Sequence, residues 1–120
     1  MTEFPKKYNL EERTAIFGED IIELCKSIKQ DAITKPLINQ LVRSGTSVGA
    51  NYMEANAASS RKDFRNKIFI CKKEAQETKH WLRMFIKCSS EKEGEIKRIQ
   101  QETQELTLIF GRIISTLEKN

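Results

Sequence analysis

The sequence predicts an all-α fold, an antiparallel up-down-up-down four-helix bundle that takes up residues 1–120 as a single domain. Apolar residues recur at alternating spacings of three and four, the period of a helix with one buried face. The 120 residues include only two prolines and five glycines, too few for the closely spaced turns of a β-sandwich. This regular apolar pattern, together with a net charge of only +4, also argues against a disordered chain.

The first half of the chain predicts two helices, at about residues 10–29 and 35–56. The first begins after Asn9, a residue that favours N-cap positions. Its apolar stripe is Leu10, Thr14, Phe17, Ile21, Leu24 and Ile28. The second helix has Thr34 as its expected N-cap and Pro36 in its first turn, where a missing backbone N–H costs nothing. Its stripe is Leu37, Leu41, Ser44, Val48, Tyr52 and Ala55.

The second half predicts two more helices, at about residues 60–88 and 91–118. Ser60 and Asp63 have the spacing of a capping box at the start of the third helix. Its stripe is Phe64, Ile68, Cys71, Ala75, Thr78, Leu82 and Phe85, and that of the fourth helix is Ile96, Ile99, Thr103, Leu106, Phe110, Ile113 and Leu117. All the connections are short, and short connections place consecutive helices side by side in opposite directions.

The sequence also predicts the compartment. The longest stretch without a charged residue runs from Ser44 to Met53, far short of the ~20 residues that cross a bilayer. The N-terminal residues lack the apolar segment of a secretory signal, so we expect a cytoplasmic protein without a membrane partner. Cys25, Cys71 and Cys88 are odd in number and have no CxxC spacing, so we expect reduced thiols and neither a disulfide nor a zinc site.

No pattern in the sequence indicates an enzyme. The segment GTSVGA lacks the preceding strand and the GK[ST] ending of a phosphate-binding loop. Glu77 and His80 have the Glu-x-x-His spacing of di-iron bundles, but His80 is the only histidine and such sites need a second pair. A Ser/His/Asp or Cys/His scheme would also depend on His80 alone. We therefore expect no catalytic residue, no metal, no cofactor and no small-molecule substrate.

Apolar and small residues cover about half of the circumference of the second helix, more than one buried seam requires. Gly45 and Gly49 lie in the extra sector, although a glycine inside a helix costs about 1 kcal/mol relative to alanine. They either let another helix of the same bundle come close or line a contact with another subunit. We predict the second, an oligomer interface formed by Gly45, Gly49 and Arg43 of this helix with Glu74, Glu77 and Trp81 of the third.

Arg43 also has a predicted partner. The second and third helices turn back near residues 58 and 59, so Arg43 and Glu74 are equally far from the turn, each about 23 Å away. Arg43 lies opposite the core stripe of its helix, and Glu74 and Glu77 share one face of theirs. We predict an ion pair between Arg43 and Glu74 or Glu77, within one subunit or across an interface.

The positive charge of the chain is concentrated in the third helix, where residues 59–90 hold nine basic and three acidic side chains. Eight of the nine lie on one arc of about 120° beside the apolar stripe. Such a charge run is frequently only a solvated face, yet a row of cations also binds nucleic-acid phosphates. The eight residues of this basic arc are Arg61, Lys62, Arg65, Lys72, Lys73, Lys79, Arg83 and Lys87.

The segment QLVRSGTSVGANYMEANAASSRKDFRNKIFICKKEAQETKHWL, residues 40–82, resembles the signature of the four-helix-bundle proteins encoded in intervening sequences of bacterial 23S rRNA genes. The accessory variability determinant of diversity-generating retroelements is a related bundle. The resemblance implies a small cytoplasmic homopentamer without known catalytic activity and with a suspected role in binding nucleic acid. It carries over no active-site residue.

Three functions remain open. A nucleic-acid-binding homo-oligomer predicts salt-sensitive binding to RNA or DNA through the basic arc, and we favour this function. An oligomeric scaffold or protein-partner module predicts a protein ligand and indifference to polyanions. An enzyme predicts a pocket with perturbed titrating groups.

Overall fold

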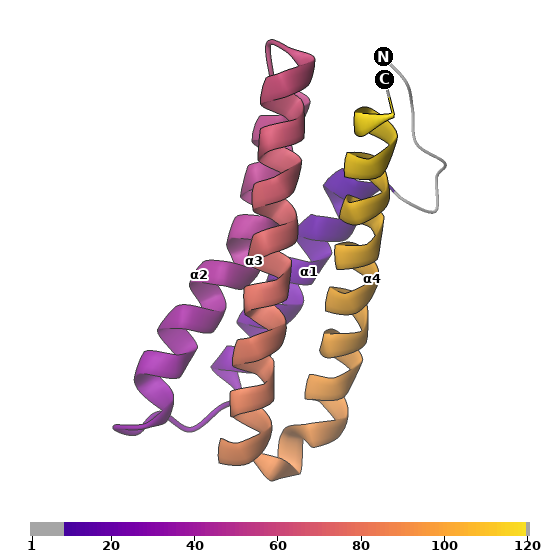
Figure 1. The fold of residues 1–120 in the computed structure, drawn as a ribbon. Helices are drawn as coiled ribbons and strands as arrows, with labels where there is room; N and C mark the ends of the chain where they lie inside the picture. The colour runs from indigo at the N-terminus through magenta and orange to yellow at the C-terminus, as the bar shows by residue number, and fades with distance from the viewer. Residues whose placement is uncertain (1–8, 120) are drawn as a thin grey trace.

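Four helices make up most of residues 9–119, the part of the chain that this computed structural model describes. They are α1 (Leu10–Lys26), α2 (Thr34–Asn56), α3 (Arg61–Cys88) and α4 (Glu93–Glu118), and a short 3-10 turn, η1 (Ser90–Lys92), leads into α4 (Figure 1). No strand occurs within residues 9–119, so the predicted all-α four-helix bundle is confirmed. Residues 1–8 and Asn120, which belong to the expected domain, lie outside the described residues.

Two of the three predicted N-caps are confirmed. The side-chain oxygen of Asn9 accepts a hydrogen bond from the backbone N–H of Glu12 at 3.4 Å. The Ser60 hydroxyl accepts one from the N–H of Asp63 at 3.0 Å. Each bond satisfies a donor that the first turn of a helix leaves without a partner.

The predicted N-cap of α2 is wrong. Thr34 already lies inside the helix, and its hydroxyl donates to the backbone oxygen of Lys29 at 2.7 Å. The Asp31 carboxylate takes over the capping role, because it accepts hydrogen bonds from the N–H groups of Ile33 and Thr34, both at 2.8 Å. These bonds lower the pKa of Asp31, the one from Thr34 first.

Two helix ends differ from the prediction. α1 ends at Lys26 and not near residue 29, because the backbone N–H of Ser27 bonds to Leu24 at 3.0 Å and the Ser27 hydroxyl donates to the same oxygen at 2.7 Å. α4 begins at Glu93 and not at residue 91, because the preceding residues form the tighter turn η1.

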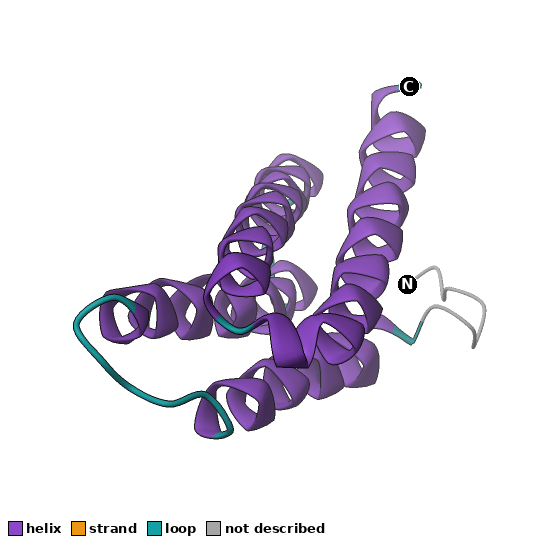
Figure 2. Ribbon diagram, turned by 90° about the horizontal axis from the view of Figure 1, so that it is seen from below, coloured by secondary structure: helices purple, strands orange, loops and turns teal. Residues whose placement is uncertain are grey.

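The contacts between α2 and α3, which lie side by side in Figure 1, follow opposite chain order. From the α2–α3 turn outward, the contacts join Glu54 to Lys67, Val48 to Cys71, and Ser44 to Thr78. α1 packs against α2 and touches α4 less extensively. The loop between α1 and α2 is the long teal segment of Figure 2.

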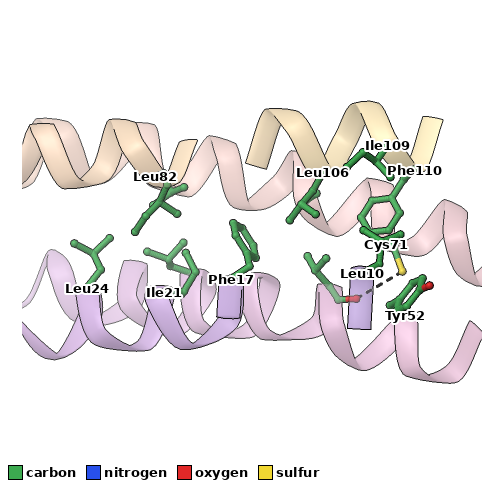
Figure 3. Close-up of a cluster of buried hydrophobic side chains, with 14 of the residues drawn as sticks. Leu10, Phe17, Ile21, Leu24, Tyr52, Cys71, Leu82, Leu106, Ile109 and Phe110 are labelled. Carbon is green, nitrogen blue, oxygen red and sulfur yellow. Dashed lines mark hydrogen bonds between the residues drawn. The ribbon is translucent and has the colours of Figure 1, made fainter. Parts of the chain in front are cut away.

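The core lies between the four helices and is built from the predicted stripes. Nearly every stripe residue is buried, whereas Leu37, Phe64 and Leu117 are partly buried at its ends. Figure 3 shows the aromatic and aliphatic side chains of the helices pointing toward one another. The polar residues of the stripes form hydrogen bonds inside the core. The buried Thr78 hydroxyl, for example, lies 2.9 Å from the Ser44 hydroxyl and donates to the backbone oxygen of Glu74. The largest fully buried side chains are Phe17, Phe85, Phe110, Ile21, Leu24, Leu41, Ile68, Leu82, Ile96, Ile99, Leu106 and Val48.

Gly45 and Gly49, which we expect at a subunit interface, both lie against α1 of the same chain. A Cβ on Gly45 would stand 2.8 Å from Cγ1 of Ile21, and one on Gly49 would stand 3.3 Å from the backbone oxygen of Thr14. Ile21 and Thr14 both belong to α1 of the same chain. The two glycines therefore permit a close approach of α1 to α2, and their place in a subunit interface stays a prediction.

Burial changes the pKa of two cysteine thiols. Cys25 and Cys71 are buried, and burial raises the pKa of the Cys25 thiol to about 11 and that of Cys71 to about 12. Cys88 is exposed. No helix within residues 9–119 has both the length and the apolar character needed to cross a bilayer.

Candidate nucleic-acid interface

The basic arc lies on α3 along its boundary with α4, and part of it is used within the chain. Nη2 of Arg61 donates to the backbone oxygen of Leu117 at 3.0 Å. Arg65 forms an ion pair with Glu118. Because both partners lie in the last turn of α4, where the helix dipole is negative, the two arginines hold the end of α4 against α3.

Two further members of the arc face the middle of α4. Nζ of Lys79 donates to Oε1 of Gln104 at 2.7 Å. Lys72 is half-buried, and its Nζ lies 3.9 Å from the position that a Cβ on Gly111 would take. The Lys72 amine therefore lies close to α4 at Gly111.

The remaining four members, Lys62, Lys73, Arg83 and Lys87, are exposed, and we call them the open edge. No salt bridge joins any of them to a carboxylate of residues 9–119. An exposed cation without a carboxylate partner contacts an anion without first breaking an ion pair. The open edge is thus the part of the arc that is available to phosphate groups.

One aromatic side chain lies among these cations. Phe69 is 40% exposed, and the guanidinium carbon of Arg65 lies over its ring at 4.9 Å from the centroid. This cation–π contact covers one face of the ring. Only the other face of the Phe69 ring is therefore open to a further contact.

Lys67, the basic residue of α3 that we left out of the arc, faces the other way. Its Nζ lies 2.7 Å from Oε1 of Glu54 on α2. The hydrogen bond to Glu54 raises the pKa of Lys67. Lys67 therefore contacts α2, whereas the members of the basic arc with partners in the chain contact α4.

The open edge ends in a groove beside the turn between α3 and α4, with a volume of about 650 Å³. The groove is lined by residues of α3, η1 and α4, and two of them belong to the basic arc. The lining residues are Arg83, Met84, Ile86, Lys87, Ser90, Glu93 and Lys97. Nζ of Lys97 lies 2.8 Å from Oε2 of Glu93, a hydrogen bond that raises the pKa of Lys97. Glu93 and Lys97 carry no signal in the sequence, because α4 has no charge excess that marks them.

The predicted ion pair of Arg43 is confirmed within one chain. Its Nη1 lies 3.2 Å from Oε1 of Glu74, and its Nη2 pairs with Glu77. The indole N–H of Trp81 donates to the same Glu77 carboxylate at 3.0 Å. Nε of Arg43 also donates to Oε1 of Gln40 at 3.3 Å. Four of the predicted interface residues thus form one hydrogen-bonded cluster between α2 and α3: Arg43, Glu74, Glu77 and Trp81.

His80 lies at the edge of this cluster. Its ring meets that of Trp81 edge-on, with the centroids 4.9 Å apart, and its side chain is exposed. Within the part of the chain that the structure describes, no three His, Cys, Asp or Glu side chains gather as a metal site would require.

A second set of ion pairs, which no pattern in the sequence predicts, joins α1 to α4. Arg13 lies 2.7 Å from Glu102 and 2.8 Å from Glu105, and the hydrogen bond to Glu102 is the main cause that raises the pKa of Arg13. Arg98 lies 3.6 Å from Asp20. These pairs join two helices that approach each other over a shorter length than α1 and α2 do.

Comparison with known proteins agrees with this architecture. The family model described as 23S rRNA-intervening sequence protein matches residues 6–111. A crystal structure of a protein of unknown function from the S23 ribosomal protein family of Bacteroides thetaiotaomicron VPI-5482 is 33% identical to this chain, with a TM-score of 0.77. That likeness covers 87% of this chain and 96% of the other. A search of curated proteins found no match. The chain therefore belongs to the family of 23S rRNA-intervening sequence proteins.

Proposed function

We propose that this chain is a non-enzymatic nucleic-acid-binding protein, an antiparallel four-helix bundle that works as a homo-oligomer and contacts phosphates through the basic arc of α3. The observation that carries the proposal is the open edge, four exposed cations on one helix without a carboxylate partner in residues 9–119. Its members are Lys62, Lys73, Arg83 and Lys87.

The length of the open edge suits a nucleic acid. Lys62 and Lys87 are separated along α3 by about 38 Å, close to one turn of a duplex. Contacts of this kind recognise charge and spacing and read no base, so we expect binding to RNA and to DNA with little sequence preference. Each phosphate contact releases counterions, so the affinity falls steeply as salt rises.

The homo-oligomer, a pentamer by resemblance, is supported by large apolar side chains that one copy leaves exposed. They are Ile16, Ile22, Ile33, Met53, Phe69 and Leu108. Burial of such side chains between copies removes apolar surface from water, and an assembly presents several basic arcs to one nucleic acid. Light scattering of the purified protein measures the mass, and a monomer mass rejects this part of the proposal.

A gel shift with a structured RNA and with a DNA duplex at low salt tests the binding itself. The test variant reverses three charges of the open edge, Lys73→Glu, Arg83→Glu and Lys87→Glu. The matched control makes the same change of net charge on exposed lysines elsewhere, Lys26→Glu, Lys29→Glu and Lys35→Glu. We expect the test variant to lose binding and the control to keep most of it, since only the first set lies on the basic arc.

Equal losses in the two variants would mean that net charge alone attracts the nucleic acid. A wild-type protein that ignores both polyanions even at low salt would contradict the proposal. In that case the basic arc is a solvated face, and the scaffold or protein-partner function takes its place.

A further inference from the structure

The groove beside the α3–α4 turn combines two kinds of surface. Its apolar lining residues are Met84 and Ile86, which we call the apolar floor. The lining also contains three cations, Arg83, Lys87 and Lys97. Of the three cations, only Lys97 has a carboxylate partner within the lining, Glu93 at 2.8 Å, so the groove as a whole is positive.

A ligand for such a groove has an apolar body and a negative charge. The volume of about 650 Å³ lies within the range of small-molecule sites and accommodates a nucleotide. Arg83 and Lys87 belong to both the groove and the open edge of the basic arc, so a strand whose phosphates follow the arc reaches the groove without a break.

We propose that this groove receives one unpaired base of the bound nucleic acid. The base lies on Met84 and Ile86, and the phosphates beside it contact Arg83 and Lys87. This inference rests on the proposed function and adds to it a substrate class, a duplex interrupted by a bulge or an overhang.

The chemistry of the base explains the preference. A base that is already unpaired enters the groove without the cost of unstacking and unpairing that a paired base must meet. The thioether of Met84 makes favourable contacts with flat aromatic rings and adapts its shape to them. A continuous duplex offers only its phosphates and leaves the apolar floor in water.

Three RNA duplexes of the same sequence test the inference by fluorescence anisotropy. The first is fully paired, the second carries one unpaired adenosine, and the third carries an abasic nucleotide at the same place. The abasic duplex keeps the extra phosphate and the flexibility of the bulge and removes only the base. We expect wild-type protein to bind the adenosine bulge up to about tenfold more tightly than the abasic one.

Met84→Gln removes the apolar contact at the floor, and we expect it to abolish this difference while the affinity for the paired duplex stays unchanged. Ala50→Gln is the control, because Ala50 is an exposed apolar residue of α2 that lies outside the groove lining. It should keep the preference.

Equal binding of the adenosine and abasic bulges, or a preference that survives Met84→Gln, would overturn the inference and leave the basic arc as a phosphate-binding surface. Failure of the wild type to bind any of the three duplexes is a different result. It would reject the proposed function, and the groove proposal with it.

Discussion

Arg43 of α2 and Glu74 of α3 form an ion pair at 3.2 Å in which one partner is buried and the other is half exposed. The Glu74 side chain is only 11% exposed, whereas that of Arg43 is 48% exposed. The arginine therefore supplies the positive charge for a carboxylate that has little access to water. This asymmetry determines what each substitution does.

Arg43→Ala should lower the free energy of unfolding by about 1 to 3 kcal/mol, because it leaves the buried Glu74 carboxylate without its cation. Urea unfolding measures the loss. Lys26→Ala is the control, since its pair with Glu23 is exposed on both sides and should contribute under about 0.5 kcal/mol. An Arg43→Ala variant as stable as wild type would contradict a structural role for the pair.

Two Gly→Ala substitutions should act in opposite directions. Gly45→Ala should destabilise the protein by about 1 to 2 kcal/mol, because its Cβ would stand 2.8 Å from Cγ1 of Ile21. Gly94→Ala should stabilise it by up to about 1 kcal/mol, because nothing lies within 4 Å of that Cβ and alanine favours the helix. Thermal unfolding of both variants checks the signs, and a stabilising Gly45→Ala would mean that α1 does not pack closely on α2.

The three cysteines should react at different rates with a thiol reagent at neutral pH. Cys88 is exposed and should react at once in the native protein. Burial raises the pKa of Cys25 to about 11 and of Cys71 to about 12, so both stay protonated, and both are shielded from the reagent. Counting thiols before and after denaturation should give one and then three, and fast reaction of a second thiol in the native state would contradict the burial of Cys25 or Cys71.

Asp31 should make stability depend on acid pH. The N–H groups of Thr34 and Ile33 lower its pKa in the folded state, so its contribution is present above the unfolded pKa, near 4, and is lost as the pH falls through the lower folded value. The stability difference between wild type and Asp31→Ala should therefore shrink below about pH 4. A difference that stays constant down to strongly acid pH would show that the carboxylate charge does not cap α2.

The helical period predicted the core residues. It could do so because the apolar stripe of each helix is buried regardless of which other helix packs against it. The short α2–α3 turn also fixed the register that brings Arg43 level with Glu74. The period does not determine which neighbour covers each flank of a stripe, so the contact of Gly45 and Gly49 with α1 of the same chain could not be predicted from it.

Only part of the candidate site could be predicted, because the pattern of one helix does not show what a neighbouring helix contributes. The helical wheel placed eight cations on one arc, but it could not show that Arg61 and Arg65 reach the end of α4. That contact depends on how α4 lies against α3 after the chain turns back. The groove needs both helices as well, because Lys97 joins Arg83 and Lys87 only across the turn.

The salt dependence of nucleic-acid affinity tests the central claim, that the open edge of α3 contacts phosphates, most directly. Affinity for one RNA duplex is measured over a range of salt concentrations for the wild type and for a variant with Lys73→Gln, Arg83→Gln and Lys87→Gln. If each of these residues neutralises one phosphate, the slope of log affinity against log salt becomes shallower by about 3 in the variant. An unchanged slope would contradict the claim, because the phosphates would then be bound elsewhere on the protein.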